Sequence, residues 1–294
     1  MGNFDHRQKG PRRGQDRWRQ AKPQREERQH GGFRHDDRRP GKPGDQHRHG
    51  KSQLERVFGK HSVEAVLLKR PKAIRRLLIA GRESYYDAII AECKERNVRV
   101  EVVPWPEFLK LGEFTEAEKH QGILALVTPI HTFGDGDLDR LKTASCVIAL
   151  DQVSNPQNLA TILRSASFFH VDAIILMRHR SADVTPEVQR YAVGGAEFVD
   201  IYKITNLADT IDELKQLNFR VFGLDERGER TLAQAQFPEK TALVIGAEGE
   251  GLRQKTRAHC DELIRIPGGR KAVESLNASV AATIALYEFY RLRG

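Results

Sequence analysis

The sequence has few cysteines, no long apolar run and no cluster of metal-ligand residues. Cys93, Cys146 and Cys260 lie far apart and form no C-x-x-C pair, which argues against a disulfide-stapled fold and a thiolate zinc site. No stretch approaches the roughly 18 apolar residues of a membrane-spanning helix. With 294 residues, 39% of them hydrophobic, the chain can bury the cores of about two domains, and we expect reduced thiols in the cytoplasm.

Aliphatic residues are nearly absent from residues 1–51. This segment holds 15 Lys and Arg against 7 Asp and Glu, which accounts for the whole formal net charge of +8. A chain of this composition cannot bury enough apolar surface to offset its conformational entropy, so we expect a disordered basic tail. Such a tail attracts nucleic-acid phosphates, or it serves only as a solubilising extension. Its five histidines lack ligand spacing, so we expect no metal role.

Residues 52–128 alternate strand-like and helix-like segments, which is typical of a compact α/β domain. RRLLIA, VRVEVV and GILALV predict strands, while residues 61–69 and 85–96 predict amphipathic helices. The stretch has no acid–base pair and no glycine loop of its own. We therefore interpret it as a recognition module, with a purely structural domain as the alternative. Residues 129–143, which carry the run GDGDLD, predict a linker.

Residues 144–294 contain three apolar runs, each followed by a polar block with glycine. CVIAL, ALVIG and LIRI are short, β-branched and bounded by turn residues, so they predict buried strands of a parallel sheet. In open α/β sheets, ligands bind just beyond the carboxyl ends of the strands, where each polar block starts. We therefore expect five polar residues to converge on one crevice: Asn155, Asn158, Glu248, Ser275 and Asn277.

The block GAEGEGL does not have the spacing of a nucleotide phosphate loop. Its glycines are Gly246, Gly249 and Gly251 rather than a G-x-G-x-x-G run, and no Gly-Lys-Ser/Thr follows. Glycines in this place allow backbone N–H and C=O groups to approach a flat ligand edge. The alternative is a plain strand-to-helix turn.

Together, the three blocks resemble the signature motifs of the SpoU-type RNA 2'-O-ribose methyltransferases, in the SPOUT superfamily. The first is similar to N-x-[GA]-x-x-x-R-x-A, the second to G-x-E-x-x-G and the third to I-P…S-L-N-x-S-x-A. The matching residues are Asn158, Ala160, Arg164 and Ala166; Gly246, Glu248 and Gly251; and Ile266, Pro267, Ser275, Leu276, Asn277, Ser279 and Ala281. Residues 54–127 resemble, more weakly, the small ribosomal-protein-type substrate-binding domain that precedes many of these enzymes.

The resemblance implies a fold and a cofactor that local pattern does not give. In this family the end of the catalytic domain threads through a loop and forms a deep trefoil knot, whereas pattern alone predicts an ordinary doubly wound sheet. The implied cofactor is S-adenosylmethionine, with its adenine held by backbone groups around Gly246, Ile266 and Leu276. The resemblance also implies RNA as the partner, either tRNA or rRNA, and a homodimer that forms through the region of the last helix.

By the same resemblance, Arg164 handles the ribose 2'-hydroxyl during methyl transfer. A guanidinium has a pKa above about 12 and stays charged, which makes it a poor base. We therefore expect Arg164 to hold the adjacent phosphate bidentately and to stabilise developing alkoxide charge. The proton would then leave through that phosphate or through water. The alternative for Arg164 is a surface ion-pair partner.

Each of the other polar residues could have a structural role instead of a functional one. Asn158 lies six residues before Arg164 on a predicted helix, so the two do not share a face, and Asn158 could be only a helix cap. Ser275 and Asn277 could orient substrate and cofactor, or they could cap the last helix. Glu248 could position Arg164 or hydrogen-bond the ribose, or it could only place a charge near a helix N-terminus.

The sequence therefore predicts S-adenosylmethionine-dependent methylation of a ribose 2'-hydroxyl in tRNA or rRNA. The main alternative is a catalytically silent RNA-binding protein on the same fold, and a weaker one is methylation of a base. The third block departs from the family pattern, since GGRKAVESLN is more basic and longer than the usual turn. Arg270 and Lys271 could add a phosphate contact or change target choice.

Overall fold

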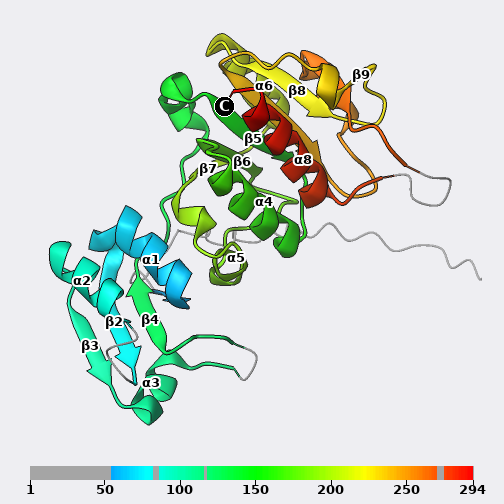
Figure 1. Ribbon diagram of the computed structural model, residues 1–294. Helices are drawn as coiled ribbons and strands as arrows, with labels where there is room; N and C mark the ends of the chain where they lie inside the picture. Colours follow the sequence, from blue (N-terminus) through cyan, green and yellow to red (C-terminus); the bar gives the residue numbers. More distant parts are fainter. Residues whose placement is uncertain (1–53, 82–85, 116–117, 270–274, 294) are drawn as a thin grey trace, which may run out of the picture. The chain divides into compact units, whose positions relative to one another are not determined.

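The computed structural model describes residues 54–81, 86–115, 118–269 and 275–293 (Figure 1). The predicted basic tail and the basic turn at Arg270 and Lys271 lie outside these ranges. Two β-sheets organise the described chain, a small mixed sheet in its first part and a large parallel sheet in its second. Within the same ranges, no helix is both long and apolar enough to cross a membrane.

The small sheet has four strands in the order β1-β4-β2-β3. Both β1 and β2 run antiparallel to β4, and β3 runs parallel to β2. The elements are β1 (Glu55–Phe58), α1 (Lys60–Lys69), the 3-10 turn η1 (Pro71–Ala73), β2 (Ile74–Ala80), α2 (Asp87–Glu95), β3 (Val100–Val103), α3 (Trp105–Gly112) and β4 (Ile123–Val127). The three predicted strands and two predicted helices are present, whereas the hydrophobic pattern gives no signal for β1 and α3.

The large sheet has seven strands in the order β7-β6-β5-β10-β8-β11-β9, and all neighbouring strands are parallel. The strands are β5 (Cys146–Asp151), β6 (Ala173–Met177), β7 (Asp200–Ile204), β8 (Arg220–Leu224), β9 (Arg230–Thr231), β10 (Thr241–Gly246) and β11 (Glu262–Arg265). This arrangement confirms the predicted α/β class with a parallel sheet. The trefoil knot stays a prediction from the family resemblance.

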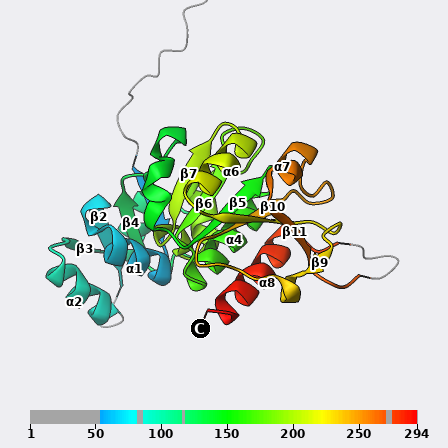
Figure 2. The same cartoon turned by 90° about the horizontal axis from the view of Figure 1, so that it is seen from above.

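Helices cover both faces of the large sheet, because its central strands are apolar on both sides. Every residue of β5 and β10 is buried. One face packs against α4 (Pro156–Phe168), α5 (Pro186–Tyr191) and α8 (Ala278–Arg291), and the other against η3 (Asp135–Thr143) and α6 (Leu207–Gln216). In Figure 2, α4 and α8 lie on one side of the sheet, while α6 and α7 (Gln254–His259) lie on the other.

Side-chain caps set where several helices begin. The Asn155 side chain accepts a hydrogen bond from the Gln157 backbone N–H at 2.9 Å, and Pro156 occupies the first helical position. The helix α4 therefore begins at Pro156, two residues before Asn158. Asn206 caps α6 through the Ala208 backbone N–H.

The predicted start of one strand is wrong. The run EFVDIY, residues 197–202, predicts a strand that starts at Glu197, but β7 begins at Asp200. The preceding residues form the short 3-10 helix η4 (Gly195–Glu197), because Gly194 turns the chain with a φ of 81°.

The predicted linker also has structure of its own. Residues 135–143 form the 3-10 helix η3, which is not a plain connector. Leu138 and Leu141 on this element are 2% exposed and belong to the core on one face of the sheet. The GDGDLD run obscures this signal, since Leu138 stands alone between two aspartates inside the run and Leu141 comes only after it.

Candidate active site

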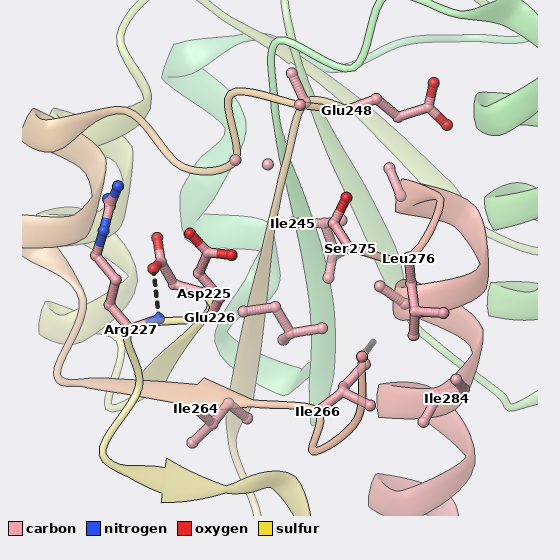
Figure 3. Close-up of a pocket in the computed structure, with 18 of the residues that line it drawn as sticks. Asp225, Glu226, Arg227, Ile245, Glu248, Ile264, Ile266, Ser275, Leu276 and Ile284 are labelled. Carbon is pink, nitrogen blue, oxygen red and sulfur yellow. Dashed lines mark hydrogen bonds between the residues drawn. The ribbon is translucent and has the colours of Figure 1, made fainter. Parts of the chain in front are cut away.

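A cavity of about 450 Å³ opens at the carboxyl ends of β8, β10 and β11 (Figure 3). Its walls come from the turn after β8, the glycine loop after β10, the loop after β11 and the start of α8. The predicted cofactor residues Gly246, Ile266 and Leu276 all line it, and so do Glu248 and Ser275. The second and third sequence blocks therefore share one cavity, at the edge of the sheet where ligands of α/β folds bind.

The glycines of the second block allow a turn that no larger residue permits. A Cβ atom on Gly246 would overlap the backbone of Gly251. Gly249 and Gly251 have φ angles of 79° and 66°, and the Gly251 N–H donates to the Ala247 carbonyl at 2.9 Å. The loop folds tightly on itself and lines the cavity with backbone, which suits the polar edge of a flat ring.

Asn158, Glu248 and Asn277 meet in one hydrogen-bonded cluster that joins all three blocks. The Asn158 Nδ2 donates to Glu248 Oε1 at 3.0 Å, and the Asn277 Nδ2 donates to Asn158 Oδ1 at 3.0 Å and also to Glu248 Oε1. Asn158 is only 5% exposed, so its amide depends on these partners. The cluster fixes the start of α4 and the start of α8 against the glycine loop.

The structure separates the capping roles that sequence leaves open. Asn155 caps α4, and Asn158 instead stands in the first turn and points to the cluster. Asn277 caps α8, since its Oδ1 accepts from the backbone N–H of Ser279 at 2.9 Å, and it belongs to the cluster as well. Ser275 does not cap the helix; it is exposed and lies on the cavity wall.

Arg164 stands apart from both the cluster and the cavity wall. It lies on the exposed side of α4, and its side chain makes no ion pair or hydrogen bond with any other described residue. Arg164 makes no hydrogen bond or ion pair with Glu248, whose carboxylate bonds to Asn158 and Asn277 instead, so a positioning role of Glu248 stays a prediction. The guanidinium is therefore available to a ligand outside the cavity.

Sequence reasoning missed Gly195, which brings a turn against α4. A Cβ on Gly195 would lie 2.9 Å from the Arg164 Cα and 3.0 Å from the Leu163 carbonyl oxygen. The turn at η4 thus packs against the backbone that carries Arg164. The signal available in the sequence is the Gly194–Gly195 pair, because glycine often marks a place where another backbone approaches closely.

Asp151 is a second residue near the cavity loops that the sequence does not single out. It ends β5, is fully buried, and accepts hydrogen bonds from the Arg253 Nε at 2.6 Å and the Arg253 backbone N–H at 3.0 Å. A buried carboxylate needs such a partner. The pair ties the end of β5 to the start of α7, just beyond the glycine loop. An acidic residue directly after an apolar strand is the signal that could have found it.

Comparison with known proteins identifies the chemistry that this arrangement serves. The SpoU methyltransferase AviRb from Streptomyces viridochromogenes, solved in complex with AdoMet, superposes with a TM-score of 0.66 at 28% identity. The match covers 82% of this chain and 91% of that one. The fold and the cavity thus define a methyltransferase that uses S-adenosylmethionine. The apolar walls at Ile245, Ile266 and Leu276 and the backbone of the glycine loop fit an adenine ring.

Sequence relatives point to the same chemistry over most of the chain. The 23S rRNA (guanosine-2'-O-)-methyltransferase RlmB of Pseudomonas aeruginosa is 37% identical over 82% of this chain and 98% of its own length. The protein of the same name in Escherichia coli is 37% identical over 81% and 99%. Residues 145–287 match the family model of the SpoU rRNA methylases, and residues 56–133 match that of RNA 2'-O ribose methyltransferase substrate binding. The chain belongs to the SpoU rRNA methylase family.

The chain is therefore an S-adenosylmethionine-dependent RNA 2'-O-ribose methyltransferase, as the three sequence blocks predict. The comparisons give no support to a catalytically silent RNA-binding protein, since the similar relatives over both parts of the chain are named as methyltransferases.

Proposed function

We propose that this enzyme methylates the 2'-hydroxyl of a guanosine in 23S rRNA, and that it does so in the cytoplasm. Relatives of that name match it over both the small-sheet part and the large-sheet part, at nearly their full length. The observation that carries the proposal is this match over both parts of the chain, and the cluster of Asn158, Glu248 and Asn277, which holds three sequence-distant blocks together beside the cavity, supports transfer at that place.

In this proposal Gly246, Ile266 and Leu276 hold the adenine of the cofactor, and Ser275 lies where its side chain can meet substrate or cofactor. Bound S-adenosylmethionine supplies an electrophilic methyl group on a sulfonium, whose sulfur leaves as a neutral thioether. The cluster keeps the loops that form the cavity in fixed register. The ribose oxygen displaces the thioether directly, so holding the two reactants in line contributes much of the rate acceleration.

Arg164 acts on the RNA rather than on the cofactor. Its exposed guanidinium has no partner among the described residues and is free to hold a phosphate next to the target ribose by two parallel hydrogen bonds. The same charge stabilises the alkoxide that develops as the hydroxyl attacks. Because a guanidinium does not deprotonate in this pH range, the hydroxyl proton leaves through the phosphate or through water.

Residues 52–128 recognise the RNA, and residues 144–294 carry out transfer. The small sheet presents an aromatic group suited to an unpaired base: Trp105 is 47% exposed, and its ring stacks on Phe108 with centroids 5.9 Å apart. His120 packs against the same ring at 5.5 Å. Base stacking on such a ring tolerates many sequences. The basic residues 1–51 add phosphate affinity without sequence choice.

The enzyme acts as a homodimer through the exposed face of α4 and α8. Phe168, Tyr287 and Tyr290 are 75%, 55% and 45% exposed there, an unusual gathering of aromatic surface. The small residues Ala278 and Ala282 face the core instead, so they seat α8 within its own subunit. Arg164 lies four residues before Phe168 on α4 and thus on the same face, so a partner bound here would come close to it.

The test is transfer of a radiolabelled methyl group from S-adenosylmethionine into purified 23S rRNA, 16S rRNA and tRNA that lack the modification. Digestion to nucleosides then identifies the product. We expect label only in 23S rRNA and only as 2'-O-methylguanosine. Label in tRNA, or on a base with its 2'-hydroxyl free, would overturn the proposed target.

A further inference from the structure

The turn after β8 brings two adjacent carboxylates to the cofactor cavity, and only one of them is already paired. Asp225 is occupied: its Oδ1 accepts the Arg227 backbone N–H at 3.0 Å, and its Oδ2 lies 3.5 Å from Arg257 Nη1. Its side chain is 5% exposed. Glu226 also lines the cavity, is exposed, and has no hydrogen bond or ion pair with another described residue. Figure 3 shows both side chains rising from the turn on the side of the glycine loop.

The glycine loop adds a second uncompensated carboxylate from another wall. Glu250 lines the cavity, is exposed, and has no ion-pair or hydrogen-bond partner in the described part of the chain. Glu248, two residues earlier, is already held by the amides of Asn158 and Asn277. Arg227 is the one cation among the described lining residues. Four carboxylates line the same wall: Glu226 and Glu250, which have no partner among the described residues, and Asp225 and Glu248, which are paired. The described part of the cavity wall therefore has a net negative charge.

Methyl transfer changes the charge of the molecule that this wall surrounds. S-adenosylmethionine carries a sulfonium, an ammonium and a carboxylate, for a net charge of one positive unit. In the reaction the ribose oxygen forms a bond to the methyl carbon, the carbon–sulfur bond breaks, and its electron pair stays on sulfur. The hydroxyl proton leaves to solvent. The product, S-adenosylhomocysteine, has a neutral thioether and no net charge, so a negative wall attracts it less than it attracts the cofactor.

We propose that Glu226 and Glu250 make the cavity selective for the charged cofactor over its neutral product. The inference rests on the methyl-transfer function proposed above and assigns a role within that site to two further residues. Their carboxylates act through charge and not through a bond to the reacting atoms, so they are specificity-determining rather than catalytic residues. The consequence is that the spent cofactor is released more readily than the fresh one.

The experiment is calorimetric titration of the full chain, without RNA, with S-adenosylmethionine, S-adenosylhomocysteine and sinefungin. Sinefungin carries an amine in place of the sulfonium methyl group, so it reports charge without reaction. The variants are Glu226→Gln, Glu250→Gln and both together. Glu229→Gln is the matched control, because Glu229 is exposed four residues beyond Asp225 but does not line the cavity.

We expect each cavity variant to weaken S-adenosylmethionine and sinefungin binding roughly 3- to 10-fold at low salt, while the product changes less than about 2-fold. The difference should shrink at high salt, and Glu229→Gln should bind all three ligands as the wild type does. An equal loss for cofactor and product would overturn the inference and indicate hydrogen bonds to the shared ribose. Unchanged affinities would overturn it too. If the wild type bound none of these ligands, the proposed function itself would fail.

Discussion

Asn277 performs two tasks with the two ends of one amide. Its Oδ1 caps α8, and its Nδ2 donates to Asn158 and Glu248. Asn277→Ser keeps a capping oxygen, so we expect it to be more stable than Asn277→Ala, but it loses the Nδ2 donor and should show clearly reduced methyl transfer. Asn277→Ala loses both and should also lower the free energy of unfolding by about 1 kcal/mol. Urea unfolding and a labelled-transfer assay measure the two effects. Full activity in the serine variant would show that the cluster is dispensable.

At the same scale, sequence located the polar residues but could not assign their tasks. Spacing predicts that Asn158 belongs to a motif, yet the run SNPQN offers several caps for one helix. Only the backbone geometry shows that Asn155 is the cap and that Asn158 is left for Glu248. The six-residue offset correctly predicts that Arg164 and Asn158 lie on different faces, since Asn158 is buried and Arg164 is exposed.

At the scale of elements, the contact between η4 and α4 holds the helix that carries Arg164. Gly195→Ala would place a Cβ 2.9 Å from the Arg164 Cα, so we expect α4 to shift. Because small displacements of a catalytic group slow a reaction strongly, methyl transfer should fall about tenfold or more. Gly136→Ala is the control, because a Cβ there meets nothing within 4 Å. Cofactor affinity should change little in either variant. Equal activities of the two variants would contradict a positioning role for this contact.

Sequence patterns predicted long elements better than short ones. The pattern of residues 278–291 predicts the last helix, and α8 runs from Ala278 to Arg291. The helix α3 is only eight residues long and opens with Trp105 and Pro106, so it lacks the length that makes a 3.6-residue period visible. Strand β1 has four residues and pairs only with β4, a contact far along the chain that local pattern does not contain.

At the scale of the whole molecule, the three thiols lie in the packed structure as neutral groups. Burial raises the pKa of Cys93 to about 11 and that of Cys260 to about 12, and it raises the pKa of Cys146 further. In the unfolded chain these thiols ionise near pH 9, so their contribution to stability is present below pH 9 and is lost as the pH rises toward the folded-state values.

We expect slow alkylation by iodoacetamide at pH 8 in the native enzyme and fast alkylation of all three thiols in urea. Mass spectrometry counts the adducts, and rapid native labelling of Cys93 would contradict this account.

The aromatic face of α4 and α8 gives a prediction about assembly. Tyr287→Asp places a charge on that face, so we expect sedimentation velocity to show a monomer where the wild type sediments as a dimer. Val102→Asp is the control, since Val102 is 46% exposed on β3 of the small sheet. A wild type that sediments as a monomer at micromolar concentration would rule out the proposed homodimer.

The strand order of the large sheet could not be predicted from the sequence. Short β-branched runs predict a parallel sheet, and the strands β5, β10 and β8 do lie side by side in parallel. The order in which strands insert between one another depends on contacts between distant segments, and local pattern does not record them. The family resemblance, rather than periodicity, is what suggests a knot.

The central claim is that the cofactor site and the RNA-activating arginine are separate parts of one active site. The most direct measurement is single-turnover methyl transfer to 23S rRNA by Arg164→Lys, alongside calorimetric binding of S-adenosylmethionine. Lysine keeps the charge but cannot hold a phosphate by two parallel hydrogen bonds. We predict that the transfer rate falls about 100-fold or more while the cofactor Kd stays within about twofold, because Arg164 does not line the cavity. Retention of most of the transfer rate, or loss of cofactor binding, would contradict the account.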